Sequence, residues 1–75
     1  MCLGVPGKVI KKISNEEVLV DFGGIRRTVD AFLVPDVKEG DYVIVHAGAI
    51  IGKIDKKAFE EIVKIFRELA EVQQE

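Results

Sequence analysis

The sequence contains one cysteine, one histidine and no tryptophan among its 75 residues. A single cysteine cannot form an internal disulfide, so the disulfide framework of a small secreted protein is excluded. One cysteine and one histidine also cannot complete a tetrahedral metal site, so any metal held here needs ligands from elsewhere. The formal net charge of −2 argues against a dedicated nucleic-acid-binding protein, because such proteins usually carry a basic surplus.

Long apolar runs and recognisable catalytic sets are also lacking. The longest apolar stretch, residues 42–52, is too short for a membrane span and is interrupted by His46. The opening CLGVPG has no apolar segment of the kind found in secretory signals, so we expect a cytoplasmic protein without a membrane partner. No phosphate loop, Ser-His-Asp set or suitably spaced carboxylate pair is present, which predicts that the protein is not an enzyme.

The chain is long enough for one domain, and its first part is patterned as strands. Residues 1–54 contain short β-branched runs separated by turn residues. Gly23-Gly24 separates two such runs, and Ala47-Gly48 separates the last two, as expected for hairpins. Five short strands at this spacing predict a small OB-like antiparallel β-barrel, which leaves few exposed sheet edges.

Residues 55–75 carry a different pattern, with apolar residues at helical spacing. Asp55 is suited to cap the start of this helix. The whole chain is therefore expected to be mostly β with one C-terminal amphipathic α-helix, packed on or beside the barrel. Ile65 and Val72 lie beside the main apolar stripe and widen it beyond what a core-facing helix needs. Either the helix packs on the barrel over a broad area, or an exposed apolar edge of the helix meets another protein.

Cys2 occupies a position where a structural cysteine is not expected. If the chain up to residue 13 is one extended segment, its apolar residues share the inward face and Cys2 lies on the opposite one. The inward set is Leu3, Val5, Val9 and Ile13, and the outward set is Cys2, Gly4, Pro6, Lys8 and Lys12. Free cysteines are usually buried, whereas an outward thiolate can bind a soft, low-valent metal centre. The alternative is an incidental surface cysteine near the chain end.

The neighbours of Cys2 and the single histidine each have a structural and a functional interpretation. Gly4, Pro6 and Gly7 could bend the chain into its first strand, or could let a partner's backbone approach the thiol. His46 could be a hydrogen-bonded structural residue of a strand, or it could ligate a metal. The spacing of these residues does not decide between the two interpretations.

The opening MCLGVPGKV and the later GDYVIVHAGAIIGKID together resemble the HypC-type, or HupF/HypC, hydrogenase maturation chaperones. The resemblance covers nearly the whole chain. It implies an OB-like barrel with a C-terminal helix that acts as a scaffold in the cytoplasm. Proteins of this type help to build the Fe(CN)2CO group of nickel–iron hydrogenases. Their partners are a HypD-type iron–sulfur maturation protein and the precursor of the hydrogenase large subunit.

The resemblance also implies roles for single residues. Cys2 matches the family's essential cysteine, which helps to hold the iron and mediates both protein contacts. His46 matches a histidine near that site. We therefore expect Cys2 and His46 to contact iron, transiently held as an Fe(CN)2CO group that is shared with a partner. The expected partner-binding residues are those of the start motif, namely Cys2, Leu3, Gly4, Val5, Pro6 and Gly7.

Two other functions stay open from the residues alone. OB-like folds often bind single-stranded nucleic acid, but Phe22, Phe32 and Tyr42 are the only aromatic residues before the helix. Salt-dependent binding of single-stranded RNA would support that function, whereas we expect no nucleic-acid partner. A purely structural adaptor is the second alternative, and in that case Cys2 would be dispensable for partner binding.

Overall fold

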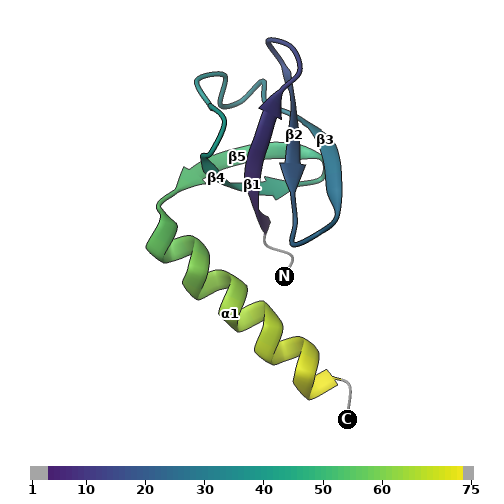
Figure 1. Cartoon of the computed structure of the whole chain (residues 1–75), viewed down its shortest axis with the longest axis vertical. Helices are drawn as coiled ribbons and strands as arrows, with labels where there is room; N and C mark the ends of the chain where they lie inside the picture. The colour runs from purple at the N-terminus through teal and green to yellow at the C-terminus, as the bar shows by residue number, and fades with distance from the viewer. Residues whose placement is uncertain (1–3, 74–75) are drawn as a thin grey trace.

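The computed structural model describes residues 4–73, with side chains described for residues 4–69. In this part of the chain, five strands form a closed barrel and are followed by one helix. Figure 1 shows the helix running away from the lower edge of the barrel. The elements in chain order are β1 (Val5–Lys12), β2 (Glu17–Asp21), β3 (Arg26–Asp30), β4 (Tyr42–His46), β5 (Ala49–Ile54) and α1 (Lys56–Gln73). The predicted fold class, a mostly β protein with a C-terminal helix, is confirmed.

The strands close into a barrel in the order β1-β2-β3-β5-β4, and β4 pairs with β1. Within the described residues, the pairings of neighbouring strands are antiparallel except at β3 and β5. Those two strands run parallel and meet at one residue pair, Asp30 and Ala49. The predicted OB-like antiparallel barrel is therefore correct, with this short parallel contact completing the closure.

Two tight turns connect antiparallel strands as the sequence predicts. Gly23 and Gly24 follow β2 with φ angles of +87° and +109°, values that a residue without a Cβ adopts at little cost. The backbone N–H of Gly24 donates to Oδ1 of Asp21 at 2.7 Å, which secures this turn. Ala47 and Gly48 join β4 to β5, with φ angles of 54° and 82°. Both turns thus use the left-handed backbone that two-residue hairpin loops require.

The core of the barrel consists mainly of β-branched side chains and has members on every strand. Its buried members are Val9, Val18, Val20, Val29, Ala31, Val37, Val43, Val45 and Ile50. Val37 comes from the segment between β3 and β4, so this segment contributes to the core as well as connecting the strands. The same segment is tied to β5 by Lys53, whose Nζ lies 2.9 Å from Oδ2 of Asp36.

The predicted alternation of faces along the first strand is wrong after Val9. A bulge interrupts the β1–β2 register between Val9 and Lys11, and an extra residue in one strand reverses which side chains face inward. Val9 is buried as expected, but Ile13 is 50% exposed and lies outside the core. The two-residue period of faces is therefore interrupted at the bulge.

The helix begins where the sequence predicts. Oδ1 of Asp55 accepts a hydrogen bond from the backbone N–H of Ala58 at 2.7 Å, which is the geometry of an N-cap. The helix α1 packs on β1 and β4. The rings of Phe59 and Tyr42 lie with their centroids 4.5 Å apart in this contact. Within residues 4–73, no helix combines the length and the hydropathy that a membrane span requires.

Replacing Gly7 with alanine is expected to destabilise the barrel by about 1–3 kcal/mol, the usual cost of overpacking a core. A Cβ at residue 7 would meet Cγ1 of Val20 and would lie 3.0 Å from Cε1 of Phe22. Urea unfolding followed by circular dichroism measures the change.

Gly52→Ala is the matched control, because a Cβ added to this strand glycine meets no atom within 4 Å. We expect it to change the free energy of unfolding by less than about 0.5 kcal/mol. Equal stability of the two variants would contradict the packing that we assign to Gly7.

Candidate functional site

The start motif and His46 are brought to the same end of the barrel by the pairing of β1 with β4. Val5 lies opposite Val45, and Pro6 lies opposite Ile44. Because the strands are antiparallel, the start of β1 adjoins the end of β4, where His46 is located. Cys2 and Leu3 lie outside the described residues, so their predicted roles stay predictions.

Gly4 and Gly7, the two glycines of the motif, are needed for the close packing of β1, a role that the sequence did not indicate. A Cβ at Gly4 would meet Cγ2 of Ile44 and would lie 3.0 Å from the carbonyl oxygen of Val45. Gly7 is equally constrained, by Val20 and by the ring of Phe22. The glycines therefore allow β1 to lie close to its neighbours. Gly7 lies within β1 and has no positive φ, so it does not form a turn.

The burial of Val5, Gly4 and Pro6 differs from the prediction. Val5 was expected to face inward but is 48% exposed, because it lies at the first position of β1 and lines an open groove. Gly4 and Pro6 were expected to point outward into solvent, yet both are buried. Ile44 lies against Gly4, and Pro6 lines the same groove as residues of α1, so neighbouring elements cover the outer face of β1.

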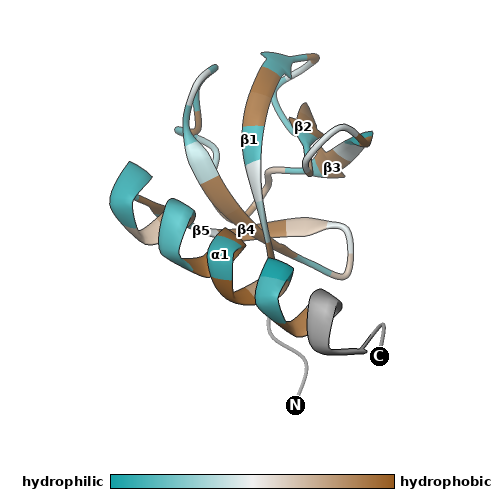
Figure 2. Cartoon of the chain, turned by 60° about the horizontal axis from the view of Figure 1, so that its bottom comes forward, coloured by the Kyte–Doolittle hydropathy of each residue, from teal (hydrophilic) through white to brown (hydrophobic). Residues whose placement is uncertain are grey.

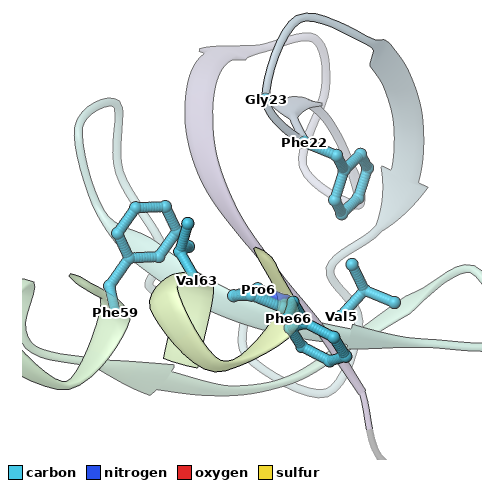
Figure 3. A pocket seen from close by; sticks show the side chains of 7 residues that line it. All are labelled: Val5, Pro6, Phe22, Gly23, Phe59, Val63 and Phe66. Carbon is cyan, nitrogen blue, oxygen red and sulfur yellow. The ribbon is translucent and has the colours of Figure 1, made fainter. Parts of the chain in front are cut away.

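An apolar groove of about 310 Å³ lies beside the start of β1. Figure 3 shows its lining side chains converging from three elements that are distant in sequence. They are Val5, Pro6, Phe22, Gly23, Phe59, Val63 and Phe66, and none of them is charged. Sequence analysis did not find this groove, since it depends on where the helix docks. The only signal was the unusual width of the apolar stripe on the helix.

The second half of α1 leaves much of its apolar face uncovered. Ile65, Phe66 and Leu69 are 56%, 44% and 52% exposed. Figure 2 shows that hydrophobic residues recur along α1 up to its last coloured turns. Ile65 therefore lies on an exposed apolar edge of the helix, and the interpretation that it packs on the barrel is wrong. The side chain of Val72 lies outside the described ones.

His46 is exposed at the end of β4 and lies opposite Ala49 of β5. No hydrogen bond of its imidazole ring to another group is found within residues 4–69. The described contacts thus do not support a hydrogen-bonded structural role. Among the same residues, no three side chains of His, Cys, Asp or Glu gather into a group that could hold a metal ion.

Among the described residues, Asp36 and Lys53 have shifted pKa values, and both lie outside the start motif. The hydrogen bond from Lys53 lowers the pKa of Asp36, and the same bond raises the pKa of Lys53. Both groups are open to solvent, and neither lines the groove. We therefore regard this pair as a surface ion pair that links β5 to the segment between β3 and β4.

The chain is similar to known proteins over most of its length. Residues 1–66 match the model of the HupF/HypC family. The hydrogenase maturation factor HypC of Cupriavidus necator is 41% identical over 73 residues, which cover 97% of this chain and 81% of the relative. HypC of Synechocystis sp. is 46% identical over 66 residues, covering 81% of this chain and 87% of the relative. HypC of Escherichia coli K12 is 32% identical over 79 residues, covering 97% and 87%.

The match includes the start motif, all five strands and the larger part of the helix. The resemblance found in the sequence is thereby confirmed, and the chain belongs to the HupF/HypC family.

Proposed function

We propose that this protein is a hydrogenase maturation chaperone that holds the Fe(CN)2CO unit and delivers it. It collects the unit from a HypD-type iron–sulfur maturation protein and passes it to the precursor of the hydrogenase large subunit. The protein acts in the cytoplasm as a carrier rather than a catalyst. Membership of the HupF/HypC family supports the general role, since its relatives are named hydrogenase maturation factors.

The observation that carries the proposal is the register of β1 against β4. Val5 pairs with Val45, so the residue after Val45, His46, adjoins the point where the chain enters β1. Cys2 is two residues before Gly4, and an extended chain of that length spans at most about 7 Å. The thiol and the imidazole can therefore reach a common iron atom from one end of the barrel.

A site of this kind supplies two ligands of complementary character. A thiolate suits a soft, low-valent iron centre, and a neutral imidazole suits iron as well. Two protein ligands do not fill the coordination sphere of iron. The carbon monoxide and cyanide of the unit, and groups of the docked partner, supply the others. An incomplete ligand set suits transfer, since the iron is never enclosed by this chain alone.

Replacing Cys2 with alanine is expected to abolish iron binding and co-purification with the HypD-type protein, while the barrel stays folded. The test is anaerobic co-purification from cells that also produce the HypD-type protein. Infrared spectroscopy then measures the CO and cyanide stretching bands, and circular dichroism measures folding. We expect the bands in the wild-type complex and not in the variant.

Cys2→Ser is a conservative second variant, because it keeps a side chain of similar size and shape but replaces the soft sulfur by oxygen. We expect the same loss of the infrared bands. Undiminished bands in either folded variant would exclude the thiolate as a ligand. An aggregated Cys2→Ala protein would instead indicate a structural cysteine.

His46→Ala is expected to reduce the iron content of the complex less than Cys2→Ala does. Because His46 is exposed, we expect the free energy of unfolding to change by less than about 0.5 kcal/mol. Iron analysis and urea unfolding measure the two effects, with Arg27→Ala, an exposed residue of β3, as the control. A strongly destabilised His46→Ala protein with undiminished iron in its folded fraction would assign His46 a structural role.

A further inference from the structure

We propose that α1 is a lid over the start of β1, and that it opens about Asp55 while the barrel stays folded. In the structure the lid is closed. Pro6 is buried beside the helix, and Val5 and Phe22 line the groove between the helix and the barrel. The proposal requires neither the iron unit nor a partner, so its outcome is independent of the proposed function.

The barrel is complete without the helix. Its buried core residues lie between Val9 and Ile50, before the helix begins at Lys56. The pairing of β1 with β4 closes the barrel, and no described side chain of α1 belongs to the buried core. Opening of the lid therefore leaves the core and the strand pairings in place.

The helix is joined to the barrel by a short connection without polar contacts. Asp55 is the single residue between β5, which ends at Ile54, and α1. Hinge residues commonly stand at such an element end, where a change of backbone dihedral angles moves the whole element. Within residues 4–69, no hydrogen bond or ion pair joins a residue of α1 to the barrel. Polar groups therefore do not hold the lid closed.

Apolar packing holds the lid closed mainly near its hinge. The ring centroids of Phe59 and Tyr42 are 4.5 Å apart. Further along, a groove of about 310 Å³ lies between helix and barrel, with Val63 and Phe66 on the helix side and Val5 on the barrel side (Figure 3). Opening thus breaks the contact at Phe59 but few contacts at Phe66, which is 44% exposed while the lid is closed.

The free energy of opening is therefore expected to be lower than that of global unfolding. Segments with few buried apolar contacts open locally, whereas core residues exchange their amide protons only when the domain unfolds. A free helix of 18 residues is of marginal stability in water, so an open lid exposes its amide protons to the solvent. Hydrogen exchange consequently reports on the opening of the lid.

Opening changes the surface that the barrel presents. Val5, Pro6 and Phe22 lose the cover of α1, and the apolar surface at the start of β1 becomes accessible. A ligand that needs Pro6 uncovered binds only the open protein, so its apparent affinity is reduced by the fraction of molecules that are open. The position of the helix therefore regulates binding at this end of the barrel.

The test is hydrogen exchange measured by nuclear magnetic resonance on the full chain, with Ile50→Val as the decisive variant. Ile50 is fully buried in the barrel core, where loss of one methylene group lowers the stability. We expect about two- to tenfold faster exchange of the core amides of β2 and β4, and unchanged exchange of residues 60–69. In the wild-type protein, residues 60–69 are expected to exchange about tenfold faster or more than those core amides, after correction for intrinsic rates.

Phe59→Ala tests the contact that holds the lid closed, with Ile65→Ala as its matched control. Both changes replace an apolar residue of α1 by the best helix former, but Ile65 is 56% exposed and does not line the groove. We expect Phe59→Ala to speed the exchange of residues 60–69 by about tenfold or more, while the chemical-shift dispersion of the barrel is retained. Ile65→Ala is expected to leave the exchange of these residues nearly unchanged.

Four results would overturn the proposal. Equal acceleration of α1 and the strands by Ile50→Val would show that helix and barrel unfold as one unit. Exchange that is fast only toward residue 69, with residues 60–63 as slow as the strands, would show fraying of the helix end. Unchanged exchange in Phe59→Ala, or loss of the folded barrel in that variant, would also reject the lid.

Discussion

The pairing of β1 with β4 is the contact on which the rest of this structure depends. It closes the barrel, and it brings the first described residues of the chain beside His46. Close approach of the two strands requires that residue 4 has no Cβ, since one would meet Ile44 and the backbone of Val45. A glycine in the start motif is therefore a condition of the fold, whatever it also contributes to binding.

The helix α1 is packed on the barrel at its start and is partly exposed further along. Its N-terminal turns are held by the cap at Asp55 and by the packing of Phe59 on Tyr42. Beyond these contacts α1 extends past the barrel, and its apolar residues stay partly exposed. Because a domain of 75 residues buries a limited share of its surface, apolar side chains left outside the core cost stability that a small protein has little of.

In the proposed carrier role, this chain supplies only some of the ligands of the iron. The described residues hold no cluster of metal ligands, and His46 stands exposed at the end of a strand. An iron unit held by one thiol and one imidazole, with further ligands from the unit and from a partner, can pass between proteins without the chain unfolding.

Much of the fold could be predicted from local patterns. The β-branched runs, the glycine turns and the helical period indicated five strands and one helix, because strand and helix preferences act over a few neighbouring residues. The strict alternation of faces failed at two places for reasons that are not local. The bulge after Val9 reverses the faces beyond it, and Pro6, though on the outer face, is covered because α1 docks beside it.

For the site, the sequence by itself determined which side chains have the required chemistry. Cys2 is the only thiol and His46 the only imidazole, and the start motif indicated the family before any fold was known. Only the tertiary structure decided that the end of β4 adjoins the start of β1, and that three distant segments form one apolar groove. The reason is physical: strand register and helix docking are set by side-chain packing among residues far apart in the chain, which no local pattern records.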